Sequence, residues 1–158
     1  MPESDGAVQL IGDGLIAQVL DKARRSTRLR ANHNFHSGAE ANPQRFLNVL
    51  VEGTYIAPHR HRDPPKTESF LVLEGCVAVL CFDDNGAITD RYLVGSGSDA
   101  KGIDLPAGVW HTIAAVTPHA VCFEVKPGPW DPATDKEFAS WAPMEGDPGA
   151  PAYLASLL

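Results

Sequence analysis

Apolar residues recur at helical spacing near the start of the chain and at strand spacing through its centre. Between Gly14 and Arg25 they fall three or four positions apart, which predicts an amphipathic helix. From residue 44 to residue 126, short apolar runs are bounded by Gly, Pro, Asn and Asp, which predicts strands. The predicted strands are Arg45–Val51, Thr54–Ala57, Ser69–Leu73, Val77–Phe82, Arg91–Val94 and Val121–Lys126. Many short strands at this spacing are typical of a β-sandwich or barrel.

Turn and capping signals mark the connections and the end of the barrel. Asp83-Asp84-Asn85-Gly86 predicts a hairpin with a type I′ turn, because Asn-Gly tolerates the positive φ angles of this turn. Thr134-x-x-Glu137 is a capping box and predicts a short helix over residues 134–142. We therefore expect an all-β domain with an N-terminal helix and a C-terminal helical or loop cap. The expected parts are an N-terminal arm and helix over 1–30, a barrel over 31–130 and a cap over 131–158.

Length, charge and cysteine usage narrow the class of protein. The 158 residues suit one domain, and 20 acidic against 13 basic residues give a net charge of −7, which argues against nucleic-acid binding. Apolar runs are too short for a membrane span, and the first residues lack the basic and apolar regions of a signal peptide. The three cysteines are an odd number without a Cys-x-x-Cys pair, so we expect a reducing, cytoplasmic compartment.

A group of histidines carries the strongest chemical signal. His59 and His61 are separated by one residue, so both side chains leave the same face of a strand. Glu68 follows shortly, and His111 lies on a distant strand. Imidazole and carboxylate ligands together suit divalent first-row metals such as Fe, Mn, Ni, Cu or Zn. Two histidines near a loop are also common as surface residues, so the surrounding residues decide between these interpretations.

The surroundings of these residues resemble the two motifs of the cupin superfamily. Gly53, five residues, His59-Arg60-His61, then Glu68 and Gly75 are similar to the first motif, with a gap of six residues before Glu68 rather than three or four. Pro106-Ala-Gly108-Val-Trp-His111 is similar to the second motif, without its upstream Gly and trailing Asn. The resemblance implies a double-sheet jelly roll with a metal inside the barrel, held by His59, His61, Glu68 and His111.

A narrower resemblance covers about residues 20 to 130. Three segments are similar to the WbuC family of cupin metalloproteins: Arg28-x-Arg30-x-Asn32-x-Asn34-Phe35-His36, Gln44-Arg45-Phe46-Leu47-Asn48 and Lys66-x-Glu68. That family is named for its occurrence in bacterial surface-polysaccharide gene clusters. The resemblance implies a fold, a metal site and sugar chemistry, and it implies no particular reaction.

Lys66 and Tyr55 are the candidate catalytic residues. Lys66 lies two positions before Glu68, and Tyr55 shares the face of His59 if the strand is unbroken. A lysine or a phenol near a metal can transfer a proton. The alternatives are a solvated loop lysine and an aromatic residue that only fills the barrel.

Four further residues are candidates for substrate or second-layer contacts. Asn32, Asn34 and His36 alternate along one face, so they either line the pocket or belong to an edge strand that faces water. Arg45 and Asn48 are three residues apart, so in a regular strand their side chains leave opposite faces, and Arg45 is the predicted inward residue. Two alternatives stay open elsewhere. The bases between residues 22 and 30 form a solvated helix end or an anion-binding patch, and Glu124 either pairs with Lys126 or faces the barrel interior.

These observations support three hypotheses about function. The preferred one is a cytoplasmic, homodimeric enzyme that holds one divalent transition metal ion (Fe, Mn, Ni or Zn) and isomerises or epimerises a small polar, anionic or sugar-like substrate. A sugar or nucleotide-sugar of surface polysaccharide (O-antigen) synthesis is the preferred substrate class, on grounds of family resemblance. The alternatives are an Fe(II)-dependent dioxygenase and a non-catalytic cupin that binds a small ligand.

Overall fold

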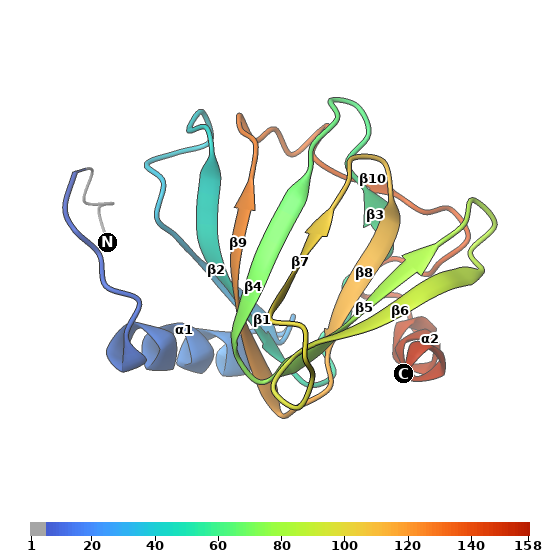
Figure 1. Cartoon of the computed structure of the whole chain (residues 1–158). Helices are drawn as coiled ribbons and strands as arrows, with labels where there is room; N and C mark the ends of the chain where they lie inside the picture. The colour runs from blue at the N-terminus through green and yellow to red at the C-terminus, as the bar shows by residue number, and fades with distance from the viewer. Residues whose placement is uncertain (1–5) are drawn as a thin grey trace.

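Two antiparallel β-sheets pack face to face in the computed structural model, which describes residues 6–158 (Figure 1). The first five residues of the predicted N-terminal arm lie outside the described part of the chain. The elements are α1 (Asp13–Arg25), β1 (Arg30–Asn34), β2 (Gln44–Val51), β3 (His59–Arg60), β4 (Glu68–Glu74), β5 (Cys76–Phe82), β6 (Ile88–Gly95), β7 (Gly102–Leu105), β8 (Trp110–Ala115), β9 (His119–Lys126), β10 (Glu137–Phe138) and α2 (Ala150–Leu157). One sheet has the order β1-β2-β9-β4-β7 and the other β10-β3-β8-β5-β6. Distant segments pair in both sheets, as in a jelly roll.

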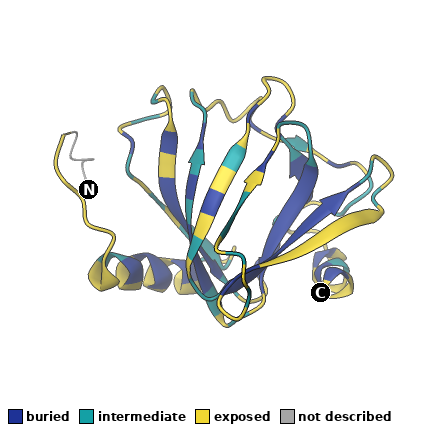
Figure 2. Ribbon diagram, viewed as in Figure 1, coloured by how far each residue is buried: buried dark blue, intermediate teal, exposed yellow. Residues whose placement is uncertain are grey.

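Alternate residues of each strand face the interior between the sheets. In β5, Val77, Val79 and Cys81 belong to this core, whereas Leu80 and Phe82 pack on the outside. Figure 2 shows β5 and β8 buried along their length, and most of β6 exposed at the sheet edge. Burial on both faces explains why the sequence of β5 is apolar without interruption.

The N-terminal helix covers the outer face of the first sheet (Figure 1). Its buried side packs against outward-facing residues of β2 and β9. The contacting residues are Ile16, Val19, Leu20 and Ala23 on the helix and Leu47, Val49 and Val121 on the strands. The predicted helix is therefore confirmed to within one residue. Among residues 6–158, no helix is long and apolar enough to cross a membrane.

The C-terminal segment crosses the outer face of the second sheet, and the helix predicted over residues 134–142 is wrong. Glu137 and Phe138 form β10 instead and pair with Arg60 and His59 of β3. A capping box needs Glu137 to reach back to Thr134, but its carboxylate accepts hydrogen bonds from Arg60 Nε (2.7 Å) and Nη2 (2.9 Å). The helix of the cap comes later, as α2, which packs on the outside of the second sheet.

Two other local predictions are corrected by hydrogen bonding. Residues 54–57 do not form the predicted strand, because their backbone hydrogen bonds with side chains instead of with a neighbouring strand. For example, the Thr112 hydroxyl donates to Ile56 O. The hairpin after β5 forms, but its turn is not type I′, because Leu29 is the one non-glycine residue of the described chain with positive φ. Asp83 Oδ1 instead accepts the N–H groups of Asn85 (2.8 Å) and Ala87 (2.9 Å).

Candidate metal centre

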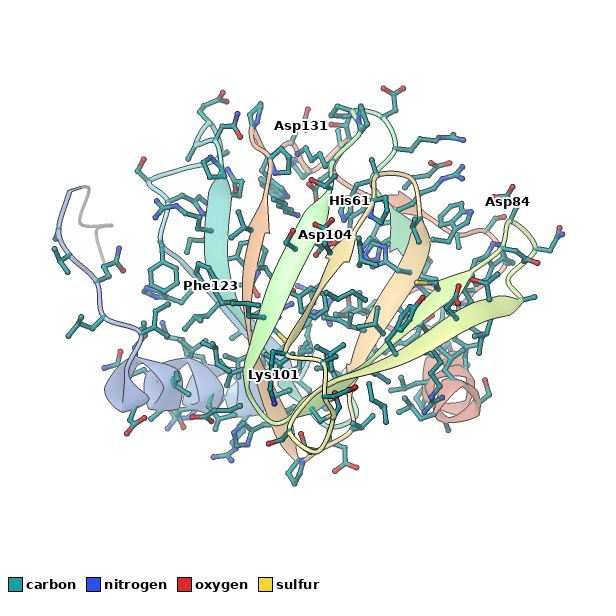
Figure 3. The ribbon with its side chains drawn as sticks, viewed as in Figure 1. His61, Asp84, Lys101, Asp104, Phe123 and Asp131 are labelled. Atoms are coloured by element: carbon teal, nitrogen blue, oxygen red, sulfur yellow. The ribbon has the colours of Figure 1, made fainter. Side chains whose placement is uncertain are left out.

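Four predicted ligands meet inside the barrel. His59 lies on β3 and pairs in register with His111 of β8, while Glu68 begins β4 in the opposite sheet. His61 follows β3 and projects between the sheets near one end of the barrel (Figure 3). Each residue offers one ligand atom, and these atoms all lie within 4.8 Å of one another.

Backbone carbonyls orient all three imidazole rings. The Nδ1–H groups of His59 and His111 donate to the carbonyls two residues before them, Ala57 O and Val109 O, each at 2.9 Å. His61 Nδ1–H donates to Asp135 O, which belongs to the segment that crosses the end of the barrel. A ring that donates through Nδ1 keeps its Nε2 lone pair for a metal, which is the usual arrangement around a metal-binding histidine.

The distances and charges fit a divalent cation. Glu68 Oε2 lies 3.2 Å from His61 Nε2 and 3.1 Å from His111 Nε2. Neighbouring ligands at right angles on an ion with bonds of about 2.1 Å are roughly 3 Å apart. His61 Nε2 is buried and has no hydrogen-bond partner among the described residues. These donors could therefore hold a first-row divalent metal, which would satisfy this nitrogen.

Without a bound ion, the pKa values of the ligand side chains are set by burial and by their interactions with Glu68. Burial, together with the positive charge that His111 carries when protonated, holds the pKa of His59 well below its ordinary value. Burial opposes ionisation of Glu68, but the hydrogen bond from His111 and the close approach of His61 outweigh it and hold the pKa of Glu68 well below its ordinary value. For His111, burial is outweighed by the hydrogen bond to Glu68, so its pKa is raised. Binding of a cation would displace that proton.

The long gap between His61 and Glu68 is closed by the loop itself. Lys66 N–H donates to His61 O at 3.3 Å, and Arg62 bridges to Pro65. The chain thus turns back within this loop and delivers Glu68 to the inner face of β4. The extra residues lengthen the hairpin without displacing the carboxylate.

Comparison with protein families matches residues 11–94 to the model described as Domain of unknown function (DUF6016), which covers more than half of the chain. The chain belongs to the DUF6016 family. No curated protein matches this DUF6016 chain.

Solved structures show that this DUF6016 protein has a cupin fold. The capsular polysaccharide assembling protein CapF of Staphylococcus aureus superposes with a TM-score of 0.58 at 24% identity, over 72% of this chain and 32% of CapF. NovW, a 4-keto-6-deoxy sugar epimerase from Streptomyces spheroides, gives 0.50 at 21% identity, over 60% and 50%. An oxalate oxidase in complex with glycolate gives 0.56 at 17% identity, over 84% and 73%. The DUF6016 chain therefore spans about a third of CapF and half of NovW.

Tyr55 lies on the wrong side of the sheet for the predicted catalytic role. It packs with Ala114 of β8 and with Leu154 of α2, on the face opposite to His111. Its hydroxyl donates to Pro143 O at 2.6 Å. The prediction assumed a regular strand through residue 55, and the irregular backbone there removes the period-two argument.

Lys66 is not a solvated loop residue. It is 5% exposed, and its ammonium donates to Pro129 O at 2.8 Å and to Asp135 Oδ1 at 3.4 Å. Both acceptors belong to the segment that crosses the barrel end, the same segment whose Asp135 O orients His61. Lys66 therefore lies beside the metal centre, and proton transfer by it stays a prediction.

The residues upstream of the histidines divide between the surface and the interior. Asn32 and Asn34 lie on edge strand β1 and are exposed, which supports the edge-strand alternative. His36 is buried, and its Nδ1 contacts the backbone of Arg45, while its predicted contact with a substrate stays a prediction. Arg45 is exposed, so its predicted inward position is wrong. Asn48 is the inward residue, because it pairs with Cys122 of the core.

The bases after α1 hold an intramolecular carboxylate. Arg28 and Arg30 each bind Glu145 of the C-terminal segment through two nitrogens, at distances of 2.7–2.9 Å. These two arginines therefore form neither a solvated helix end nor an open anion patch.

A second carboxyl group lies beside the ligands, at a position for which the sequence left two alternatives open. Glu124 is 3% exposed and faces the interior from β9, where Asn48 Nδ2 donates to it at 3.1 Å. Burial, followed by the charge of Glu68, raises the pKa of Glu124 to about 8. Glu124 is two and four residues after Cys122 and Ala120, so its side chain leaves the same face of the strand, and both of those residues face the core. This alternation was the feature of the sequence that indicated its inward position. The alternative in which Glu124 faces the barrel is thus the observed one.

Proposed function

We propose that this DUF6016 protein is a mononuclear metal-binding cupin enzyme that isomerises or epimerises a small polar substrate. The convergence of the three imidazoles and Glu68, with ligand atoms within 4.8 Å of one another and every Nδ1 bound to a carbonyl, carries the proposal. His59, His61, Glu68 and His111 would hold the ion. When bound, a divalent metal supplies Lewis acidity toward a carbonyl or hydroxyl of the substrate.

A sugar or nucleotide-sugar is the proposed substrate class. The solved structures with this fold include a capsular polysaccharide assembling protein and a 4-keto-6-deoxy sugar epimerase, as their names state. The resemblance of the sequence to the WbuC family supports the same class, through surface polysaccharide synthesis. Membership of WbuC, the cytoplasmic location and the homodimer stay predictions.

The residues of the chain supply orientation and a route for protons. Asp135 O, Ala57 O and Val109 O fix the rings so that the Nε2 atoms face one point. Lys66 is the proposed proton carrier beside the site, since it is buried and lies two residues before Glu68, the first residue of β4. A Lys66→Met variant should retain the metal and lose most of the turnover.

Metal analysis tests the ligand set. The full chain is purified without chelator, beside a His59→Ala/His111→Ala double variant and a His119→Ala control, whose imidazole pairs with Glu74 instead. We expect about one equivalent of transition metal in the wild type and the control, and loss of it in the double variant. Absence of metal from the wild type, with none taken up on reconstitution, would contradict the metal centre.

Solvent exchange tests the reaction. Isomerases and epimerases of this kind remove a proton next to a carbonyl, so metal-loaded protein in D₂O should incorporate deuterium into a nucleotide-linked 4-keto-6-deoxy sugar under anaerobic conditions. Mass spectrometry reads the exchange, and the His59→Ala/His111→Ala variant gives the background. Metal-loaded protein that causes no exchange above this background would overturn the isomerase assignment for this substrate class.

An Fe(II)-dependent dioxygenase is the second candidate, favoured by the mixed histidine and carboxylate donors, a set that also suits oxygen chemistry. Oxygen consumption that requires both iron and a candidate substrate would favour it over the isomerase. Metal and ligand binding without turnover in either assay would favour a non-catalytic cupin.

A further inference from the structure

Three lysines surround one buried carboxylate at the end of the barrel next to the metal centre. Asp135 is 3% exposed. Lys126 Nζ lies 3.1 Å from its Oδ2, Lys66 Nζ lies 3.4 Å from its Oδ1, and Lys136 Nζ lies 3.7 Å from its Oδ2. A single aspartate therefore faces three ammonium groups, which leaves two positive charges without a counter-charge inside this group.

The neighbouring acids are already engaged. Glu137 follows Lys136 directly, but Arg60 and Arg62 bind its carboxylate. Glu68 contacts His61 and His111, and Glu124 accepts a hydrogen bond from Asn48. The excess positive charge of the lysine group is thus not neutralised by another ion pair among the described residues.

Lys136 is more exposed than the other two lysines and is bound less closely to Asp135. Lys66 and Lys126 are 5% and 8% exposed, and both hydrogen bond to Asp135, so they fasten the crossing segment to β4 and β9. Lys136 makes no hydrogen bond to Asp135, and its side chain is 38% exposed. Burial and the charge of Lys126 both lower the pKa of Lys136, which shows how unfavourably a third cation is placed there.

The lysine group is coupled to the metal centre through the backbone. Asp135 supplies the carboxylate to the lysines and, through its carbonyl, the acceptor for His61 Nδ1–H. Lys126 lies two residues after Glu124 on the inner face of β9, and Lys66 lies two residues before Glu68. The lysine group therefore lies beside the residue whose carbonyl orients the His61 ligand.

We propose that Lys136, backed by Lys66 and Lys126, binds an oxyanion of the substrate, either a carboxylate or a phosphate group. An anion there would neutralise the excess charge and accept charge-assisted hydrogen bonds from Lys136 Nζ. The inference rests on the proposed function for the role of this anion in a substrate. Binding of a simple anion needs only the lysines.

Calorimetric titration tests the site with two probes, inorganic phosphate and acetate, at constant ionic strength. The proteins are the full metal-loaded wild type, Lys136→Gln, Lys136→Arg and the control Lys101→Gln, whose exposed lysine lies at the opposite end of the barrel (Figure 3). We expect Lys136→Gln to weaken binding about tenfold, which is the change given by 1.4 kcal/mol. Lys136→Arg and Lys101→Gln should stay within about twofold of the wild type.

The two probes identify the anion class, because the probe with the larger loss in Lys136→Gln is the preferred one. Equal affinity in wild type and Lys136→Gln for both probes, or no saturable binding to the wild type, overturns the inference. Metal content is measured on the same samples, and the titrations are repeated on metal-free protein. Absence of metal with Lys136-dependent anion binding would reject the proposed function alone, and metal without such binding would reject the anion site alone.

Discussion

Replacing Glu145 with glutamine should weaken the attachment of the C-terminal segment to the start of the barrel. Glu145 accepts from Arg28 Nε and Nη2 at 2.7 and 2.9 Å, and from Arg30 Nη1 and Nη2 at 2.9 and 2.8 Å. Glutamine keeps the shape and removes the negative charge, as protonation would. The variant therefore isolates the ionic part of these contacts.

The size of the effect follows from the pKa of Glu145. The hydrogen bond from Arg28 outweighs burial and, with Arg30, lowers this pKa from 4.5 to about 2. A shift of this size corresponds to at most about 3.4 kcal/mol. The Glu145 side chain is 33% exposed and that of Arg28 is 60% exposed, so solvent screening reduces the expected stabilisation to about 1 kcal/mol.

The pH dependence has a definite sign. Because the folded-state pKa is depressed, the stabilisation is fully present above the ordinary pKa of 4.5 and is lost as the pH falls through about 2. At pH 3 the unfolded carboxyl is protonated and the folded one is still largely ionised, so roughly two fifths of the effect remains.

Urea unfolding at pH 7 and pH 3 measures both quantities. The control is Glu52→Gln, an exposed glutamate with no ion pair among the described residues, and it should leave the free energy of unfolding within about 0.5 kcal/mol of the wild type. A Glu145→Gln protein as stable as the control at pH 7, or a deficit that does not shrink at pH 3, would refute the reasoning.

Three further changes test packing and backbone, each by urea unfolding beside a matched control. Asn48→Ala should lower the free energy of unfolding by about 1–3 kcal/mol, because it leaves Glu124 without its amide donor. The control Asn32→Ala, on the exposed edge strand, should stay within about 0.5 kcal/mol of the wild type, and equal effects of the two changes would contradict the inward position of Asn48. Leu154→Ala should lower the free energy of unfolding by about 2–4 kcal/mol, because this side chain of α2 is only 8% exposed. The control Leu158→Ala, at a residue that is 48% exposed, should have little effect. A small loss in Leu154→Ala would mean that α2 does not cover the sheet. Gly75→Ala should lower the free energy of unfolding by at least about 2 kcal/mol more than Gly97→Ala. Both glycines have positive φ, but only at Gly75 would an added Cβ meet a backbone atom, His119 O, at 2.2 Å. Similar losses in the two variants would show that the backbone around Gly75 adjusts easily.

Local pattern determined much of the fold. The helix at residues 13–25 and the strands β2, β4, β5, β6 and β9 follow from short-range pattern, because their apolar residues recur at helical spacing or form short runs between turn residues. The order of His59, His61, Glu68 and His111 along the chain was enough to predict that they converge, through the resemblance to cupin motifs. β7 was not predicted, because its four residues contain glycine and an acid and carry no clear alternation.

Only the tertiary structure decided which polar groups meet. Arg28 and Arg30 bind Glu145, more than a hundred residues away, and the capping box at Thr134 failed because Arg60 bound its glutamate. Parity showed that just one of Arg45 and Asn48 faces inward, and the register of β2 on β9 selected Asn48. Each outcome depends on a contact between distant segments, and a charged side chain takes the nearest partner that the fold offers rather than one that its local sequence specifies.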